Sequence, residues 1–168
     1  LGFEERFQLV LDNFHEWEME LLSQAHNYLL WKTTGHNNAM QDRLSLDRHL
    51  VNLLTSMRLY LDHTDHGIST MFGNPSDQLE SIKKFKNTLY DKHLGYRLLE
   101  ALRNHAQHCG LPVHNISYNE SLVETRKKDK FAQVSVAPRL DFIELASNHG
   151  FKTSVLNEIK QLGEKIDL

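Results

Sequence analysis

An arginine, an asparagine and a histidine lie close together near the predicted end of a helix. Arg103, Asn104 and His108 fall within the segment EALRNHAQHCGLP, in which Gly110 and Pro112 stop the helical pattern. An arginine can neutralise a phosphate, and a histidine can move a proton to or from a reacting oxygen. These residue types therefore suit cleavage of a phosphodiester bond without a metal ion.

Spacing alone does not single out this segment, because the chain contains eleven histidines and short patterns recur by chance. Two further pairs have an arginine followed by a histidine at similar spacing: Arg43 with His49, and Arg58 with His63. In both of these pairs a leucine follows the arginine directly. Only Arg103 is followed by a side chain that can form hydrogen bonds, Asn104, and this context favours the third match.

The helical positions of the three residues limit how they can act together. Asn104 and His108 are four residues apart, so they share one helix face. Arg103 lies roughly 140° around an ideal helix from His108, so one helix cannot bring both side chains to one phosphate. A second copy packed across a two-fold axis could combine Arg103 of one chain with His108 of the other. In the alternative interpretation these are ordinary polar residues near a helix C-terminus, where cations are common.

The segment RNHAQH, on the last helix of a predicted helical bundle, resembles the HEPN family (higher eukaryotes and prokaryotes nucleotide-binding). Members of that family carry R-x4-6-H, usually with a polar residue directly after the arginine, and Arg103, Asn104 and His108 occupy those positions. The similarity covers residues 1–112. It implies an all-helical bundle that forms a homodimer, in which two motifs compose a ribonuclease site without a metal or other cofactor. Many members are toxins or effectors of antiviral defence against phage. Others have lost activity and only bind nucleotides or proteins.

The resemblance implies a transesterification in which the RNA 2′-hydroxyl attacks its own phosphate. His108 would move the proton to or from the attacking or leaving oxygen, and Arg103 would stabilise charge on the phosphate oxygens. Asn104 would orient the histidine or hold the phosphate. The products would be a 2′,3′-cyclic phosphate and a 5′-hydroxyl. A toxin of this kind would also need a restraint on its activity, which either an inhibitory partner protein or a segment outside this sequence could supply.

Composition sets the broad class of the protein. The chain has 168 residues, is 40% hydrophobic and carries a formal charge of −3, which predicts one folded domain and not a broadly basic nucleic-acid binder. Its single cysteine, Cys109, rules out an internal disulfide and favours a cytoplasmic location. We see no signal peptide and no apolar run approaching the roughly 20 residues of a membrane span.

Hydrophobic periodicity predicts a mainly α fold of about four helices, followed by a β-hairpin and one or two C-terminal helices. The first helix ends near Trp31, the second runs from about Asp42 to about Asp65, and the third begins after an N-cap at Ser76 or Asp77. The fourth ends near Cys109. We expect residues 1–112 to form the helical bundle and residues 113–168 to form an accessory unit packed on it.

Two sets of residues are expected to support the main motif. Basic side chains crowd the predicted hairpin tip and could grip an RNA backbone, although charged turns are common in any case: Arg126, Lys127, Lys128 and Lys130. Arg58 and His63, on the second helix, could line the same groove as Arg103. They could contact the substrate themselves or support the residues that do.

Two other interpretations stay open. The segment 140–162 resembles a DNA-binding helix-turn-helix, with Ala146, Gly150 and Leu156 at the expected spacing and a recognition helix from Thr153. The chain would then be a non-catalytic interaction module. Separately, His63 and His66 are close enough to share a metal ion, but a bundle site would need further ligands from facing helices. The favoured interpretation involves no metal.

Overall fold

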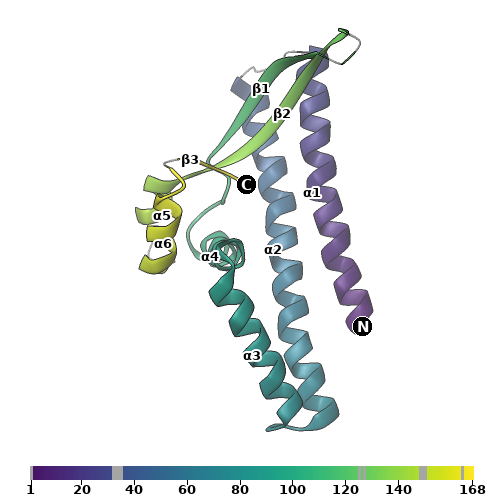
Figure 1. The fold of residues 1–168 in the computed structure, drawn as a ribbon, viewed down its shortest axis with the longest axis vertical. Helices are drawn as coiled ribbons and strands as arrows, with labels where there is room; N and C mark the ends of the chain where they lie inside the picture. The colour runs from purple at the N-terminus through teal and green to yellow at the C-terminus, as the bar shows by residue number, and fades with distance from the viewer. Residues whose placement is uncertain (1, 32–35, 125, 127, 148–150, 164) are drawn as a thin grey trace.

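Two long helices form the axis of the molecule (Figure 1). The computed structural model of the chain describes residues 2–31, 36–124, 126, 128–147, 151–163 and 165–168. Helix α1 (Phe3–Trp31) lies along helix α2 (His36–Phe72), with Trp17 buried between α1 and its neighbours. The alternation of apolar residues every three to four positions explains why these segments are helical and which face they bury.

Helix α2 continues past the end that the sequence predicts near Asp65. It runs through Gly67 and stops at Phe72, before Gly73, whose φ of 88° is readily available only to glycine. A Cβ atom at position 67 would collide with the Phe3 ring of α1. Gly67 therefore lies inside the helix, where the Phe3 side chain packs against it.

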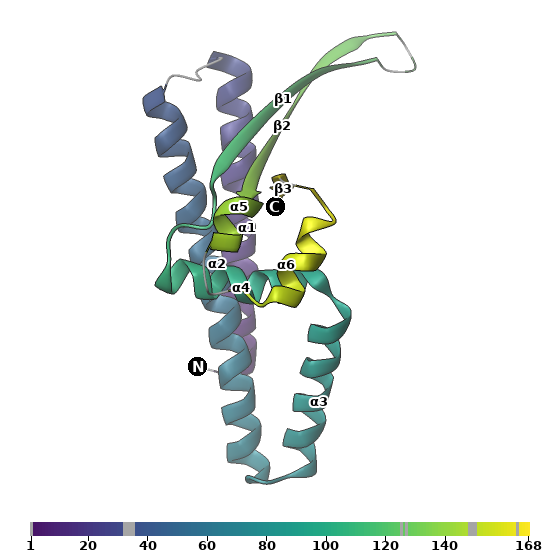
Figure 2. The same cartoon turned by 90° about the vertical axis from the view of Figure 1, so that its left-hand side faces the viewer.

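Two shorter helices pack on the other side of α2 from α1 (Figures 1 and 2). Helix α3 (Asp77–Lys92) runs back along the last turns of α2, and the Ser76 hydroxyl caps it by accepting the backbone N–H of Leu79 at 3.3 Å, as the sequence predicts. Helix α4 (Leu94–His108) then crosses α2 instead of running alongside it. Its end therefore lies against the middle of α2.

A long β-hairpin follows α4, and this confirms the predicted change of period after Pro112. Strand β1 (Asn115–Glu124) pairs antiparallel with strand β2 (Lys130–Asp141), with Tyr118 opposite Val136 and Val123 opposite Phe131. Two short helices follow, α5 (Phe142–Ser147) and α6 (Thr153–Lys160). The mainly α fold with a hairpin and C-terminal helices is as predicted, but the terminal strand β3 (Lys165–Asp167), paired with the base of β2, is not.

The centre of the core lies where α2, α4, β2, α5 and α6 meet. Its most deeply buried side chains come from all five elements: Leu46, Leu102, Leu140, Leu145 and Ile159. The two parts expected from the sequence, 1–112 and 113–168, thus contribute to one hydrophobic cluster. Among the helices that the structure describes, none is long and apolar enough to cross a membrane.

Candidate active site at the end of helix α4

The end of α4 is fixed by backbone hydrogen bonds and by one buried carboxylate. The backbone N–H groups of Cys109 and Gly110 both donate to the carbonyl of His105, at 2.8 and 3.1 Å. The following loop is held to α2, where Oδ1 of Asp47 accepts the N–H of Val113 at 2.8 Å. Asp47 is only 1% exposed, and burial raises its pKa to about 6. The last turn of α4 is therefore positioned against α2.

Asn104 and His108 are both exposed and lie one turn apart on the free face of this last turn. Arg103 is half-buried, and its Nη1 donates to Oδ1 of Asn104 at 3.0 Å. The three residues thus form a polar row around the helix end, in which Asn104 lies between Arg103 and His108 in direction around the helix axis. Among the described residues, no hydrogen bond joins Arg103 to His108, as their separation around the helix predicts.

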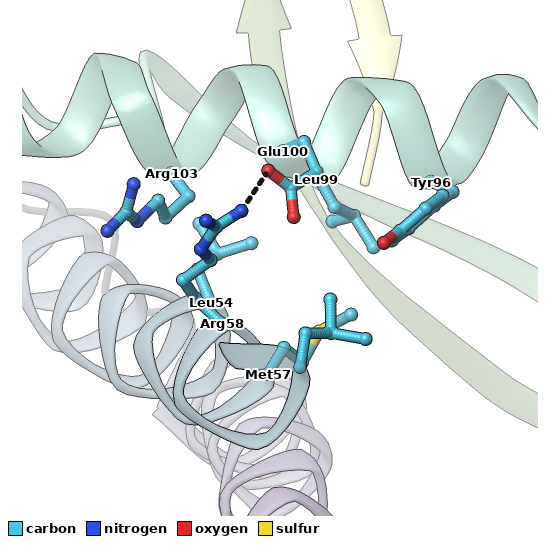
Figure 3. A pocket seen from close by; sticks show the side chains of 8 residues that line it. Leu54, Met57, Arg58, Tyr96, Leu99, Glu100 and Arg103 are labelled. Carbon is cyan, nitrogen blue, oxygen red and sulfur yellow. Dashed lines mark hydrogen bonds and ion pairs between the residues drawn. The ribbon is translucent and has the colours of Figure 1, made fainter. Parts of the chain in front are cut away.

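Arg103 lies at one end of a groove between α4 and α2, which Leu54 and Leu99 also line (Figure 3). Its Nε is buried and has no hydrogen-bond partner within the part of the chain that the structure describes. A guanidinium with an unused buried donor can donate a further hydrogen bond to an acceptor, such as a phosphate oxygen, if the side chain turns outward.

Arg58 lines the same groove as Arg103, whereas His63 does not (Figure 3). Arg58 pairs with Asp62 at 2.9 Å and with Glu100 at 3.5 Å, so its charge is already compensated. His63 is half-buried elsewhere on α2. Of the two residues expected to support the motif, only Arg58 lies beside it.

The predicted basic tip is remote from this site. Arg126, Lys128 and Lys130 are exposed around the hairpin turn, and Lys128 has a left-handed φ of 65°. Lys127 lies outside the described residues. The ten residues of β1 span about 33 Å, so the turn stands far from the end of α4 (Figure 2). The tip cannot contact the phosphate that His108 would act on.

A second pair of histidines, not identified from the sequence, lies on the buried side of the same helix end. His105 is 3% exposed, and its ring centre is 6.1 Å from that of His114. His114 accepts the N–H of Asp141 at Nδ1 (3.0 Å) and pairs through Nε2 with Glu144 (3.3 Å). Burial lowers the pKa of both imidazoles, so they favour the neutral form.

This histidine pair, with Arg43 and Cys109, lines a surface depression of about 320 Å³. Both nitrogens of His114 already have partners, so His114 has an evident structural role in tying the loop to β2 and α5. His105 could have been noticed in the sequence, because it is a polar residue in the apolar row Leu98, Ala101, Leu102. The Glu144 partner of His114 is thirty residues away in sequence and carries no local signal.

The segment interpreted as a helix-turn-helix contains the two short helices α5 and α6. In α6, Val155 and Ile159 are buried, while Thr153, Ser154 and Asn157 are exposed. Lys152, directly before this helix, donates from Nζ to the hydroxyl of Tyr90 at 3.1 Å and lies over its ring. Residues 148–150, which include Gly150 of the expected turn, lie outside the described residues.

The described residues contain no group of three or more histidine, cysteine, aspartate or glutamate side chains that could hold a metal ion, at His63 and His66 or elsewhere. Comparison of the chain with protein-family models, with curated proteins and with solved structures finds no match. Among the described residues, the polar row on α4 is the arrangement of side chains best suited to catalysis.

Proposed function

We propose that the protein is a metal-independent endoribonuclease and that Arg103, Asn104 and His108 form its catalytic row. One observation carries the proposal. The Arg103–Asn104 hydrogen bond holds a guanidinium next to the exposed face on which His108 stands, at a helix end that buried contacts fix in place. A cation, an amide and an imidazole in one accessible row are the groups that phosphodiester transesterification needs.

In this mechanism the 2′-hydroxyl oxygen attacks the adjacent phosphorus and the bond from phosphorus to the 5′-oxygen breaks. One imidazole removes the 2′-hydroxyl proton, and a second, protonated imidazole supplies a proton to the departing 5′-oxygen. Two copies of His108 in a homodimer supply both groups, and Arg103 neutralises the non-bridging phosphate oxygens. Asn104 keeps the guanidinium and the imidazole apart and aligned.

Self-association is supported by exposed apolar side chains on α1. Their spacing places them along one face of the helix, and such a surface is typical of an interface: Phe7, Leu11, Phe14, Leu22 and Leu29. Helix α4 packs against α2 and not against α1 (Figures 1 and 2). A composite site therefore requires a contact between the two α4 ends in addition to any contact through α1.

Cleavage of RNA in the presence of EDTA tests the chemistry. General acid–base catalysis contributes about 10²–10⁴-fold to a rate, so His108→Ala and Arg103→Ala should each lower cleavage by at least about 100-fold. His66→Ala, which changes an exposed histidine on α2, is the matched control and should cleave like the wild type. Equal cleavage by the wild type and by both site variants would reject the proposal.

The chain carries a built-in probe for the composite arrangement. Cys109 is its single cysteine, is exposed and follows His108 directly. A short bis-maleimide should link two chains through Cys109 if the α4 ends meet, and Cys109→Ser should abolish the link. Cleavage without such a link would show that each protomer acts alone. The proposal also includes the toxin or antiviral role and its inhibitory partner. Only the resemblance to the HEPN family supports this part.

A further inference from the structure

The distal half of the β-hairpin leaves the body of the protein. At its base Tyr118 stacks on Tyr28 with ring centres 4.9 Å apart, and its hydroxyl donates to Asp42 at 2.9 Å. Strand β3 pairs only with residues 139–141 of β2. Strand β2 contacts α1 along part of its length, and the outer ends of both strands extend away from α1 and α2 (Figure 2). We call residues 119–135 the arm.

One face of the arm is uncharged and ends in an aromatic side chain. Because side chains alternate along a strand and the register pairs Asn119 with Ser135, six residues share this face. All are exposed: Asn119, Ser121, Val123, Phe131, Gln133 and Ser135. Phe131 is 57% exposed and lies beside Val123 at the outer end. This face thus carries amide and hydroxyl side chains along its length and an exposed aromatic ring at its outer end.

Positive charge gathers next to that ring. Residues 124–130 contain four basic and two acidic side chains, in a chain whose net charge is −3. Arg126 and Lys128 lie in the turn and are exposed, whereas Lys130, which directly precedes Phe131, lies on the opposite face of the strand, across from Glu124. The end of the arm therefore attracts anions although the protein as a whole repels them.

These features fit one kind of occupant. A bilayer surface would favour a continuous apolar face, but this face is mostly serine, asparagine and glutamine. Duplex RNA is contacted through phosphates and 2′-hydroxyls and leaves no base surface for an aromatic ring. Single-stranded RNA offers unstacked bases for Phe131, polar base edges for the amides and hydroxyls, and phosphates for the cations.

We infer that the arm binds single-stranded RNA, with a base stacked on Phe131 and the adjacent phosphates held by Arg126 and Lys128. This inference rests on the proposed function for its biological meaning, because it makes the substrate a single strand. The strand β1 is about 33 Å long, so the arm holds nucleotides remote from the cleaved bond. The arm thus sets affinity for long substrates and leaves the chemical step unchanged.

Binding is measured by fluorescence anisotropy with a labelled single-stranded RNA of roughly 12 nucleotides, within the usual range of such sites. The protein is the His108→Ala variant, in which cleavage does not interfere. Adding Phe131→Ala should weaken binding by about 5- to 150-fold, the range for one base stacked on an aromatic side chain. Phe131→Trp should retain binding, which separates loss of stacking from loss of the hairpin.

Leu122→Ala is the matched control, because Leu122 is 73% exposed on the opposite face of the same strand. It should bind like the parent protein. Duplex RNA of the same length and anionic phosphatidylserine vesicles should not show the Phe131 dependence. Equal affinity of the parent and Phe131→Ala for the single strand would overturn the inference, as would equal weakening by Leu122→Ala.

Cleavage assays distinguish failure of the arm inference from failure of the proposed function. With the otherwise wild-type protein, Phe131→Ala should raise KM for the long RNA and leave kcat unchanged, and it should not alter cleavage of a dinucleotide. If the wild type cleaves nothing but the arm binds as described, the nuclease proposal fails alone. If cleavage of long RNA is insensitive to Phe131, the arm inference fails alone.

Discussion

Asp47 joins α2 to the loop that follows the candidate site, and its ionisation should weaken the fold. Its Oδ1 accepts the N–H of Val113, while its Oδ2 is buried without a partner among the described residues. Burial raises its pKa from 3.8 to about 6, and the hydrogen bond from Val113 and the charge of Arg43 oppose this rise only in part. Asp47→Asn preserves the shape and the Val113 contact and removes the charge.

The direction of the effect follows from proton linkage. The folded protein holds the Asp47 proton more tightly than the unfolded chain, so this group favours folding below pH about 4 and loses that contribution as pH rises through about 6. At about 1.4 kcal/mol for each tenfold change in acidity, the difference between 3.8 and about 6 corresponds to about 3 kcal/mol. About 2 kcal/mol of this is lost between pH about 4.5 and about 7.5.

Urea unfolding followed by circular dichroism, at these two pH values, measures the effect. The free energy of unfolding of Asp47→Asn, minus that of the wild type, should increase by about 2 kcal/mol between the lower and the higher pH. The lowered pKa values of His105 and His114 act oppositely, since their contribution is present above pH about 6.5 and is lost as pH falls. They are common to both proteins and cancel in the difference.

Asp91→Asn, which changes an exposed aspartate of α3, should show no such pH dependence and serves as the control. A difference between Asp47→Asn and the wild type that stays constant over this pH range would refute the reasoning. It would mean that the Asp47 carboxylate is stabilised in the folded protein as well as it is in water.

Two further predictions concern the elements that support the site and the arm. Tyr118→Phe removes the hydroxyl that donates to Asp42, so it should lower stability by about 1–2 kcal/mol and speed amide hydrogen exchange at the base of the hairpin; unchanged exchange there would contradict it. Leu102→Ala opens a cavity under α4 at a fully buried position and should cost about 2–5 kcal/mol in urea unfolding, whereas Leu162→Ala at an exposed position should cost less than about 0.5 kcal/mol. Equal losses for both leucines would show that the core is not where we place it.

Local sequence patterns were sufficient to predict the class of fold. The three- and four-residue spacing of apolar side chains predicts α1 and α4, and Ser76 marks the start of α3. The period-two pattern after Pro112 predicts the hairpin. These features depend on neighbours within a few residues, so they can be read without knowing what lies across the core.

The same local signals were insufficient where a distant contact decides the outcome. Gly67 resembles a helix end in the sequence but lies inside α2, and the Phe3 ring of α1 occupies the space that a side chain at this position would need. Strand β3 has only three residues and forms because the edge of β2 is available to it. The contact of Gly67 with Phe3 and the pairing of β3 with β2 each join residues far apart in the chain, so no local spacing predicts them.

The candidate site also combines features set by local sequence with features set by distant contacts. Asn104 and His108 share a face because they are four residues apart on one helix, so the sequence alone determined their common exposure if α4 formed. Only the tertiary structure decided that α4 crosses α2, that Arg58 and not His63 lies beside Arg103, and that the basic hairpin turn stands far from His108. Helical periodicity fixes directions around one axis, whereas the placement of one element against another depends on side chains far apart in the chain.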